Sequence, residues 1–306
     1  MRSQINSIVD ELKRLRKNGL DNIFVSNESL RSLKLASKGI AQVVSEKEAK
    51  RAVAAIPERI RSATPEEFDK VLKEEPKVEN RAPRNKGQTF GTPPEVELPK
   101  GDKQTRWDAL REIVRNCPTC QENVREGYQI VFGVGNLDAD IFFCGEAPGA
   151  DEEEKGEPFV DKAGQLLDKM INAMGLARKD VYIGNIMNWR PQLPTRVGNR
   201  PPTLEEIRFC LPYLKAQVEV VKPKLIVALG ATAAKGLLGS TSFRSLREVK
   251  GEWKEFEKTP VLATYHPSYL LRNDSKRDKR SAWEDLLKVM ERCKLPISDR
   301  QRGYFL

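Results

Sequence analysis

Several features of secreted, membrane-bound and disulfide-stabilised proteins are missing from this chain of 306 residues. Residues 1–20 are amphipathic and charged, and they lack the apolar core of a secretory signal. No apolar run is long enough to span a bilayer. The five cysteines are an odd number in a long chain, which argues against a disulfide scaffold. We therefore expect a soluble, cytoplasmic protein with no membrane contact.

The chain also has little histidine and only a moderate net charge. The chain has one histidine, His266, and a lone histidine is more often structural than catalytic. Lysine and arginine number 53 against 44 aspartate and glutamate residues, which leaves a net charge of +9. This surplus suits a partner that carries phosphates. Because both signs are mixed along most of the chain, an ordinary solvated surface explains the composition equally well.

Composition divides the chain into three parts. Residues 1–75 alternate apolar and charged residues at roughly helical spacing and predict a helical accessory segment. Residues 76–104 are rich in Pro, Lys, Glu and Gly, with few large apolar residues, and predict a flexible linker. Residues 105–306 have a different texture, in which apolar runs recur, and they predict the folded domain.

Strand-like and helical patterns alternate in the predicted domain. Such alternation, with strands that are apolar throughout, predicts an α/β fold: a three-layer α/β/α sandwich with a central parallel sheet. The helical N-terminal extension precedes it. The expected strands are Ile141–Cys144, Val181–Ile186, Leu225–Leu229 and Val261–Tyr265; the expected helices are about Ala163–Met174, Leu204–Val221, Ala231–Leu238 and Lys279–Cys293.

Polar and aromatic side chains gather where the predicted strands end. The first strand leads into residues 145–168, which hold a carboxylate cluster and Phe159; the second reaches Asn185, and the last reaches His266. In a doubly wound sheet these strand ends meet at one edge, where ligands bind. Plainer interpretations remain open: core packing for Phe159, a turn residue for Asn185 and a solvated acidic loop for residues 152–154.

Four stretches resemble the motifs of family 4 uracil-DNA glycosylases and follow one another in the family's order. The resemblance covers roughly residues 117–293. It implies an α/β/α sandwich that flips uracil out of DNA and hydrolyses its N-glycosidic bond in base-excision repair. The matching residues are Gly145-Glu146-Ala147-Pro148-Gly149 with Glu152, Pro158-Phe159-Val160 and residues 163–168; Asn185 with Arg190-Pro191; Asn199-Arg200 with Pro202-Thr203 and Glu205-Glu206; and His266-Pro267-Ser268 with Leu270-Leu271-Arg272.

The resemblance also implies how the base is held. Phe159 would stack on the flipped uracil, and the Asn185 amide would bond its Watson–Crick edge. The backbone at Ala147 would also touch uracil. Glu152 would crowd the C5 edge and disfavour the methyl group of thymine, whereas Glu153 and Glu154 are expected to lie in a solvated loop.

Two further residues would carry the chemistry. His266 would face the O2 oxygen and stabilise the negative charge that bond cleavage leaves on the base. Glu146 would orient or activate water and stabilise the sugar cation. No cofactor is expected to be required for these steps.

Contacts to DNA are expected from the last motif. Ser268 and Arg272 would hold phosphates. Leu270, with Leu271, would fill the gap that the flipped nucleotide leaves in the duplex. Basic residues that follow would add phosphate contacts, although a solvated helix start explains them equally well: Lys276, Arg277, Lys279 and Arg280.

The chain departs from the family at its cysteines. Members usually hold a four-iron four-sulfur cluster with four cysteines, and Cys117, Cys120 and Cys210 match three of them. The remaining position is occupied by Trp189. Three thiolates hold such a cluster poorly without another ligand. We expect that the cluster is lost; the alternative is a three-cysteine site with zinc or an incomplete cluster.

A second departure is Asp161, which adds negative charge beside Phe159 at a position where the family usually has glycine.

The expected partner is uracil-containing DNA, single- or double-stranded, and the protein is expected to be a monomer. Two other functions remain open. One is a DNA-lesion-binding module with little or no catalysis on the same fold. The other is a glycosylase for another deaminated base, such as hypoxanthine or xanthine.

Overall fold

The computed structural model describes residues 90–192 and 199–306, which fall within one compact unit. The predicted helical segment 1–75 and residues 76–89 of the predicted linker lie outside the described residues. No helix in the described part of the chain combines the length and apolar character needed to cross a membrane.

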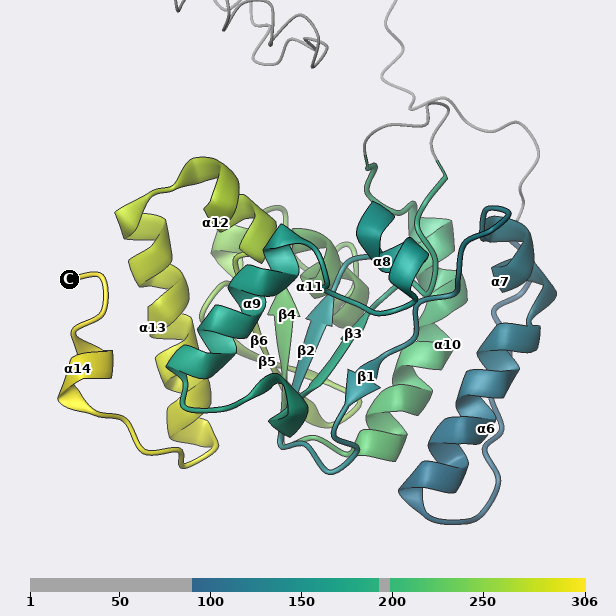
Figure 1. The fold of residues 1–306 in the computed structure, drawn as a ribbon, viewed down its shortest axis with the longest axis horizontal. Helices are drawn as coiled ribbons and strands as arrows, with labels where there is room; N and C mark the ends of the chain where they lie inside the picture. The colour runs from purple at the N-terminus through teal and green to yellow at the C-terminus, as the bar shows by residue number, and fades with distance from the viewer. Residues whose placement is uncertain (1–89, 193–198) are drawn as a thin grey trace, which may run out of the picture. The chain divides into compact units, whose positions relative to one another are not determined.

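Six strands form one mixed sheet at the centre of the described unit (Figure 1). Their order across the sheet is β1-β3-β2-β4-β6-β5. The four inner strands run parallel, and each edge strand pairs antiparallel with its neighbour. The strands are β1 (Val134–Gly135), β2 (Ile141–Gly145), β3 (Tyr182–Asn185), β4 (Leu225–Leu229), β5 (Trp253–Phe256) and β6 (Thr259–Thr264).

The predicted parallel sheet is therefore confirmed for its inner strands, and the two edge strands add to it. Strands β2, β3 and β4 are buried along their whole length, and the sequences of β2 and β4 are continuous apolar runs that are easily recognised. Strand β1 has two residues, and β5 is mostly exposed. Such short or exposed strands carry little hydrophobic pattern, which is why the sequence did not predict them.

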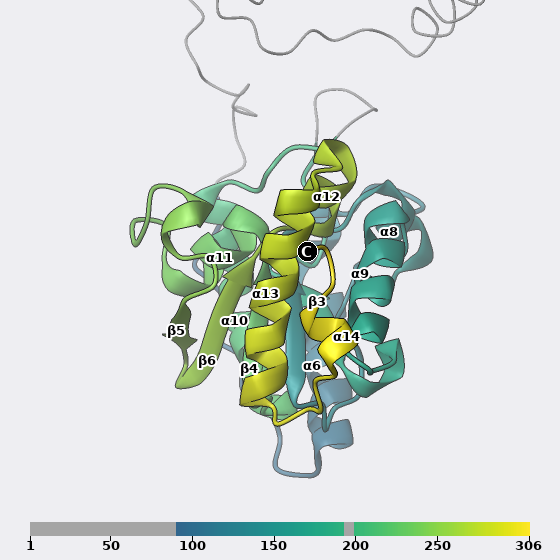
Figure 2. The ribbon, with the colours of Figure 1, turned by 90° about the vertical axis from the view of Figure 1, so that its left-hand side faces the viewer.

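Helices cover both faces of the sheet and complete the three layers (Figure 2). On one face, α10 and α11 pack against side chains such as Phe142 and Ile226. On the other face, α9 and α13 pack against side chains such as Phe143 and Val227. The helices are α6 (Lys103–Asn116), α7 (Pro118–Asn123), α8 (Ala150–Lys155), α9 (Lys162–Ala173), α10 (Leu204–Val221), α11 (Gly230–Leu238), α12 (Pro267–Asn273), α13 (Lys276–Arg292) and α14 (Asp299–Arg302).

A third apolar cluster lies outside the sandwich, where α6 and α7 meet α10. Phe90 stacks on Trp189 with ring centroids 6.2 Å apart, and Val96 and Leu98 pack against the same cluster. These three residues belong to the segment predicted as linker. The end of that segment thus packs onto the domain.

The parallel strands carry their carboxyl ends to one edge of the sheet, beside the starts of α8, α11 and α12 (Figure 1). Gly145 at the end of β2 pairs with Asn185 at the end of β3. Leu229 at the end of β4 pairs with Thr264 at the end of β6. Register alone therefore brings the predicted motifs together.

Replacement of Gly164 by alanine tests how closely α9 approaches the preceding loop. A Cβ at Gly164 would overlap the carbonyl group of Phe159, which is backbone and has little room to move. We expect Gly164→Ala to lower the free energy of unfolding by about 1–3 kcal/mol, measured by chemical denaturation. Gly91→Ala is the control, because a Cβ there meets nothing within 4 Å. Equal stability of both variants would contradict the packing.

Candidate active site

Two side chains converge on the end of β2. Asn185 and Phe159 are each 6% exposed. A Cβ at Gly145 would overlap the Asn185 Oδ1 atom and lie 2.5 Å from the Phe159 ring, so only glycine fits between them. Asn185 and Phe159 belong to different motifs of the sequence and were both predicted to contact the base; the structure brings them together.

The loop that carries Phe159 is held by the buried carboxylate of Glu152. Its Oε2 atom accepts a hydrogen bond from the Gly149 amide at 3.0 Å. Its Oε1 atom accepts from the amides of Val160 at 3.0 Å and Asp161 at 3.2 Å. Glu152 is 5% exposed, so the solvated-loop interpretation is wrong for this residue. The backbone that follows Phe159 is thereby fixed to α8.

Phe159 itself has a left-handed backbone, with φ at 55°, which is strained for an aromatic residue. Arg178, which sequence reasoning missed, donates hydrogen bonds to the carbonyls of Phe159 at 3.2 Å and Pro158 at 2.6 Å. Asp161, the departure from the family, caps α9 by accepting from the Gly164 amide at 2.9 Å. These contacts maintain the strained conformation.

His266 lies between the end of β6 and the start of α12, and its ring stacks on Phe159 with centroids 5.6 Å apart. Its Nδ1 atom accepts a hydrogen bond from the Ser268 amide at 3.1 Å. Burial lowers the pKa of His266 to about 4, so the ring is neutral at pH 7. Because Nδ1 is the acceptor, the ring proton sits on Nε2, which is a hydrogen-bond donor.

Glu146 directly follows β2 and is half-buried. Burial raises the pKa of its carboxyl group, and a hydrogen bond with Thr232 on α11 partly offsets this. Its own carbonyl accepts from the Met187 amide at 3.2 Å, which ties it to the segment after Asn185. Ala147 is partly buried against the third apolar cluster. A raised pKa of this kind is typical of carboxylates that handle protons or water.

The residues predicted to contact DNA separate into buried and exposed ones. Leu270 is 4% exposed, whereas Leu271 is 47% exposed. The prediction that Leu270 enters the duplex is therefore wrong, because α12 turns this side chain toward the protein. Ser268 Oγ lies 2.8 Å from His266 Nδ1 and accepts from Arg272 at 3.3 Å.

Part of the basic run after α12 is engaged within the protein. Lys279 forms an ion pair with Asp274, and Arg280 donates to the carbonyls of Arg302 and Tyr304. Lys276 donates to the Leu306 carbonyl. The solvated-helix interpretation is thus incomplete, since Lys276 and Arg280 hold the C-terminal segment.

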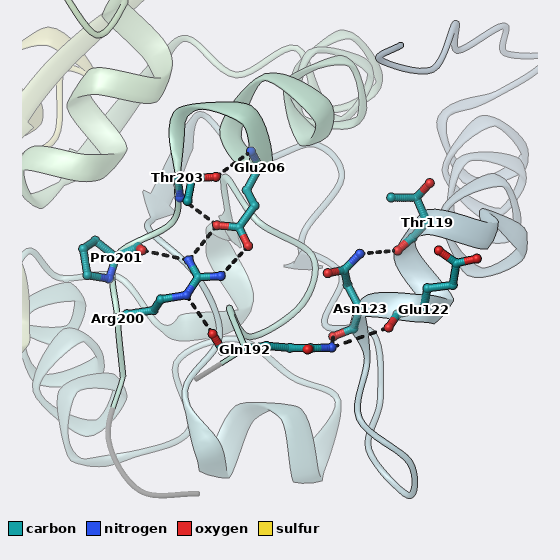
Figure 3. A network of polar contacts seen from close by, with 8 residues as sticks. All are labelled: Thr119, Glu122, Asn123, Gln192, Arg200, Pro201, Thr203 and Glu206. Atoms are coloured by element: carbon teal, nitrogen blue, oxygen red, sulfur yellow. Dashed lines mark hydrogen bonds and ion pairs between the residues drawn. The ribbon is translucent and has the colours of Figure 1, made fainter. Parts of the chain in front are cut away.

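A polar network holds the segment that follows the second motif (Figure 3). Arg200 forms a two-pronged ion pair with Glu206, with distances of 2.6 and 2.7 Å, and donates to the Gln192 carbonyl at 2.7 Å. Glu206 also accepts from the Thr203 amide and so caps α10. Gln192 and Arg200 are thereby anchored to α10.

The three predicted cysteine ligands lie near one another, together with Tyr213. Burial and the neighbouring sulfur atoms of Cys210 and Cys117 raise the pKa of the Cys120 thiol, and burial raises that of Cys210.

Trp189 stands where the fourth ligand was expected, 1% exposed and packed against Phe90 and Phe209. Its indole N–H has no hydrogen-bond partner among the described residues, and such a donor cannot ligate iron. Within residues 90–192 and 199–306, no three His, Cys, Asp or Glu side chains are arranged to hold a metal ion. These residues do not fit a four-cysteine cluster.

Comparison with known proteins agrees with the geometry. Residues 132–287, just over half of the chain, match the model of the uracil DNA glycosylase superfamily. The type-4 uracil-DNA glycosylase of Thermotoga maritima is 40% identical over 185 residues, which cover 60% of this chain and 92% of the relative. That of Archaeoglobus fulgidus is 40% identical over 196 residues, covering 61% and 94%. The motif resemblance is confirmed, and the chain belongs to the uracil DNA glycosylase superfamily.

Proposed function

We propose that this protein is a uracil-DNA glycosylase that removes uracil from DNA and leaves an abasic site. The observation that carries the proposal is that three groups converge: the Asn185 amide at the end of β3, the neutral His266 imidazole after β6, and the Phe159 ring in the loop after α8. Relatives of 40% identity named type-4 uracil-DNA glycosylase support it. All these groups come from one chain, and we also propose that the protein acts as a monomer.

Uracil is held by stacking and by hydrogen bonds. Extrusion of a nucleotide from the duplex costs a few kcal/mol, which the site must recover. The Phe159 ring supplies an apolar face, and the fixed Asn185 amide reads the Watson–Crick edge. Because Asn185 is buried and close to Gly145, its amide has little freedom to turn and accept cytosine. Glu152 acts by fixing the loop that presents Phe159 and Ala147.

Cleavage of the N-glycosidic bond leaves negative charge on the base. The Nε2 proton of His266 is positioned to donate to the O2 oxygen as this charge develops. A neutral imidazole suits this role, because it is already charge-free in the buried site and donates without transfer of its proton. Glu146 in its ionised form orients the attacking water and stabilises the sugar cation.

The DNA strand contacts the surface around α12. Exposed Leu271 fills the space left by the extruded nucleotide. Ser268 and Arg272 hold neighbouring phosphates. This surface is where the DNA partner, single- or double-stranded, approaches the site.

We also propose that the fold is stable without an iron–sulfur cluster. Trp189, Phe90 and Phe209 fill the region beside Cys117 and Cys120, and their burial stabilises the contact between α7 and α10. No step of the reaction needs the cluster, since the reacting groups lie on other elements.

Loss of activity in two variants tests the function. We expect Asn185→Ala and His266→Ala each to lower the single-turnover rate of uracil excision by about 10²–10³-fold. The assay incubates a uracil-containing oligonucleotide with enzyme and then cleaves abasic sites with alkali. Asn172→Ala, at an exposed position on α9, is the control.

The same assay separates the rival functions. No strand cleavage above the enzyme-free reaction, combined with binding of uracil-containing DNA, would identify a binding module and refute the proposal. Faster release of hypoxanthine or xanthine than of uracil would identify the protein as a glycosylase for those deaminated bases. Full activity in both variants would remove the roles of Asn185 and His266.

The pH dependence of the single-turnover rate tests the ionisation states. The pKa of His266 is lowered to about 4, and that of Glu146 is raised by burial. Activity needs neutral His266 and ionised Glu146, so the rate falls as the pH drops through these pKa values. The fall that protonation of His266 causes is expected near pH 4, and the fall that protonation of Glu146 causes is expected above the ordinary glutamate pKa of 4.5. A transition at 6.5, the ordinary histidine pKa, that remains in Glu146→Gln would show that His266 titrates as an exposed residue and contradict this assignment.

Metal analysis and stability test the packing of Trp189. The freshly purified protein is expected to lack stoichiometric iron and zinc, and chelators should leave its unfolding midpoint unchanged. Trp189→Ala should lower the free energy of unfolding by about 3–5 kcal/mol, the usual loss for a buried aromatic residue. Trp253→Ala, at a half-exposed site, should cost less. Broad visible absorbance with stoichiometric iron would overturn the proposal of cluster loss.

A further inference from the structure

Helix α8 carries two adjacent buried carboxylates. Its residues 151–154 are all acidic, yet Glu152 and Glu153 are only 5% and 3% exposed, whereas Asp151 and Glu154 are exposed. The expectation that Glu153 lies in a solvated loop is therefore wrong. A buried carboxylate must be bonded, and the two find different partners.

Glu153 binds two arginines. Its Oε1 atom accepts a hydrogen bond from Arg190 Nη1 at 2.7 Å, and this pair is 4% and 8% exposed. Arg125 forms a second ion pair with the same carboxylate, and its own side chain is 35% exposed. The Glu153 carbonyl also accepts from the Gln129 amide at 2.9 Å. One carboxylate thus joins α8 to two separate segments.

Arg190 ends the segment that begins with Asn185. At the start of this segment, the Ile186 amide donates to the Gly145 carbonyl at 3.0 Å and the Met187 amide donates to the Glu146 carbonyl. At its end, Arg190 bonds Glu153 and donates to Asn199 Oδ1 at 2.9 Å. The segment is therefore held to β2 at one end and to α8 at the other.

We propose that Glu153 is a positioning residue for uracil excision, which holds the Asn185–Arg190 segment through Arg190 and so fixes the Asn185 amide. The inference rests on the proposed function and deepens it. Glu152 fixes the loop of Phe159, and Glu153 fixes the segment of Asn185. Two neighbouring residues of α8 thereby set the distance between the stacking ring and the base-reading amide.

Energetics favour a positioning role over a purely stabilising one. A buried ion pair often contributes no more stability than apolar side chains of the same volume, because desolvation offsets the attraction. Its bonds are directional, however, and displacement of a reacting or reading group by about 1 Å lowers rates by up to about 100-fold. Glu153→Gln keeps the side-chain shape and removes the charge that both arginines share.

The test is a double-variant cycle in single-turnover excision of uracil, measured well below the unfolding midpoint of each variant. Glu153→Gln is expected to lower the rate about 10- to 100-fold. In the Asn185→Ala background the same change should lower it less than about twofold, because Glu153 then has no amide to position. Glu154→Gln, at the exposed neighbour, is the matched control and should match the wild type.

If Glu153→Gln fails to fold, Arg125→Gln replaces it in the test, since Arg125→Gln removes only the partly exposed ion-pair partner of Glu153. It should lower the rate less than Glu153→Gln and show the same loss of effect in the Asn185→Ala background. A lower unfolding midpoint with an unchanged rate would reduce Glu153 to a structural role and overturn the proposal. Equal effects in both backgrounds would also overturn it. An inactive wild-type protein would instead refute the proposed function.

Discussion

The space at position 145 is the constraint on which the site depends. Gly145 ends β2 and pairs in register with Asn185 at the end of β3. The room that a side chain would take there is used by the Asn185 amide and the Phe159 ring. Close approach of this kind needs a strained backbone at Phe159, and the contacts of Glu152 and Arg178 with the surrounding backbone maintain it. The sheet register and the loop conformation are thus mutually dependent.

Burial at this edge of the sheet acts on His266 and Glu146 in the same sense. It lowers the pKa of His266 and raises that of Glu146, so each group is driven toward its neutral form. Glu152 and Glu153 are buried more deeply and are bonded instead, one by backbone amides and the other by arginines. The bonded carboxylates hold the site together, and the less constrained groups are the ones suited to chemistry.

At the third apolar cluster, aromatic side chains surround the position at which the motif resemblance predicted a fourth cysteine. Trp189 lies between Phe90 and Phe209, close to the turn that carries Cys117 and Cys120. Burial of aromatic rings is non-directional and needs neither ionised ligands nor iron, so it joins α7 and α10 by a different physical means. Phe90 comes from a segment upstream of the sandwich, which ties that segment to the same contact.

The sequence by itself determined the inner strands, because strands buried on both faces are rich in apolar residues. It also determined the order of the motifs, which placed Asn185, Phe159 and His266 at or after strand ends. It also marked Trp189 as a departure. Only the tertiary structure decided which of two neighbouring residues in a short helix is buried. In α8 it is Glu153 and not Glu154, and in α12 it is Leu270 and not Leu271. The physical reason is that a helix of one or two turns has no hydrophobic periodicity to read, so its orientation depends on the partners that meet it.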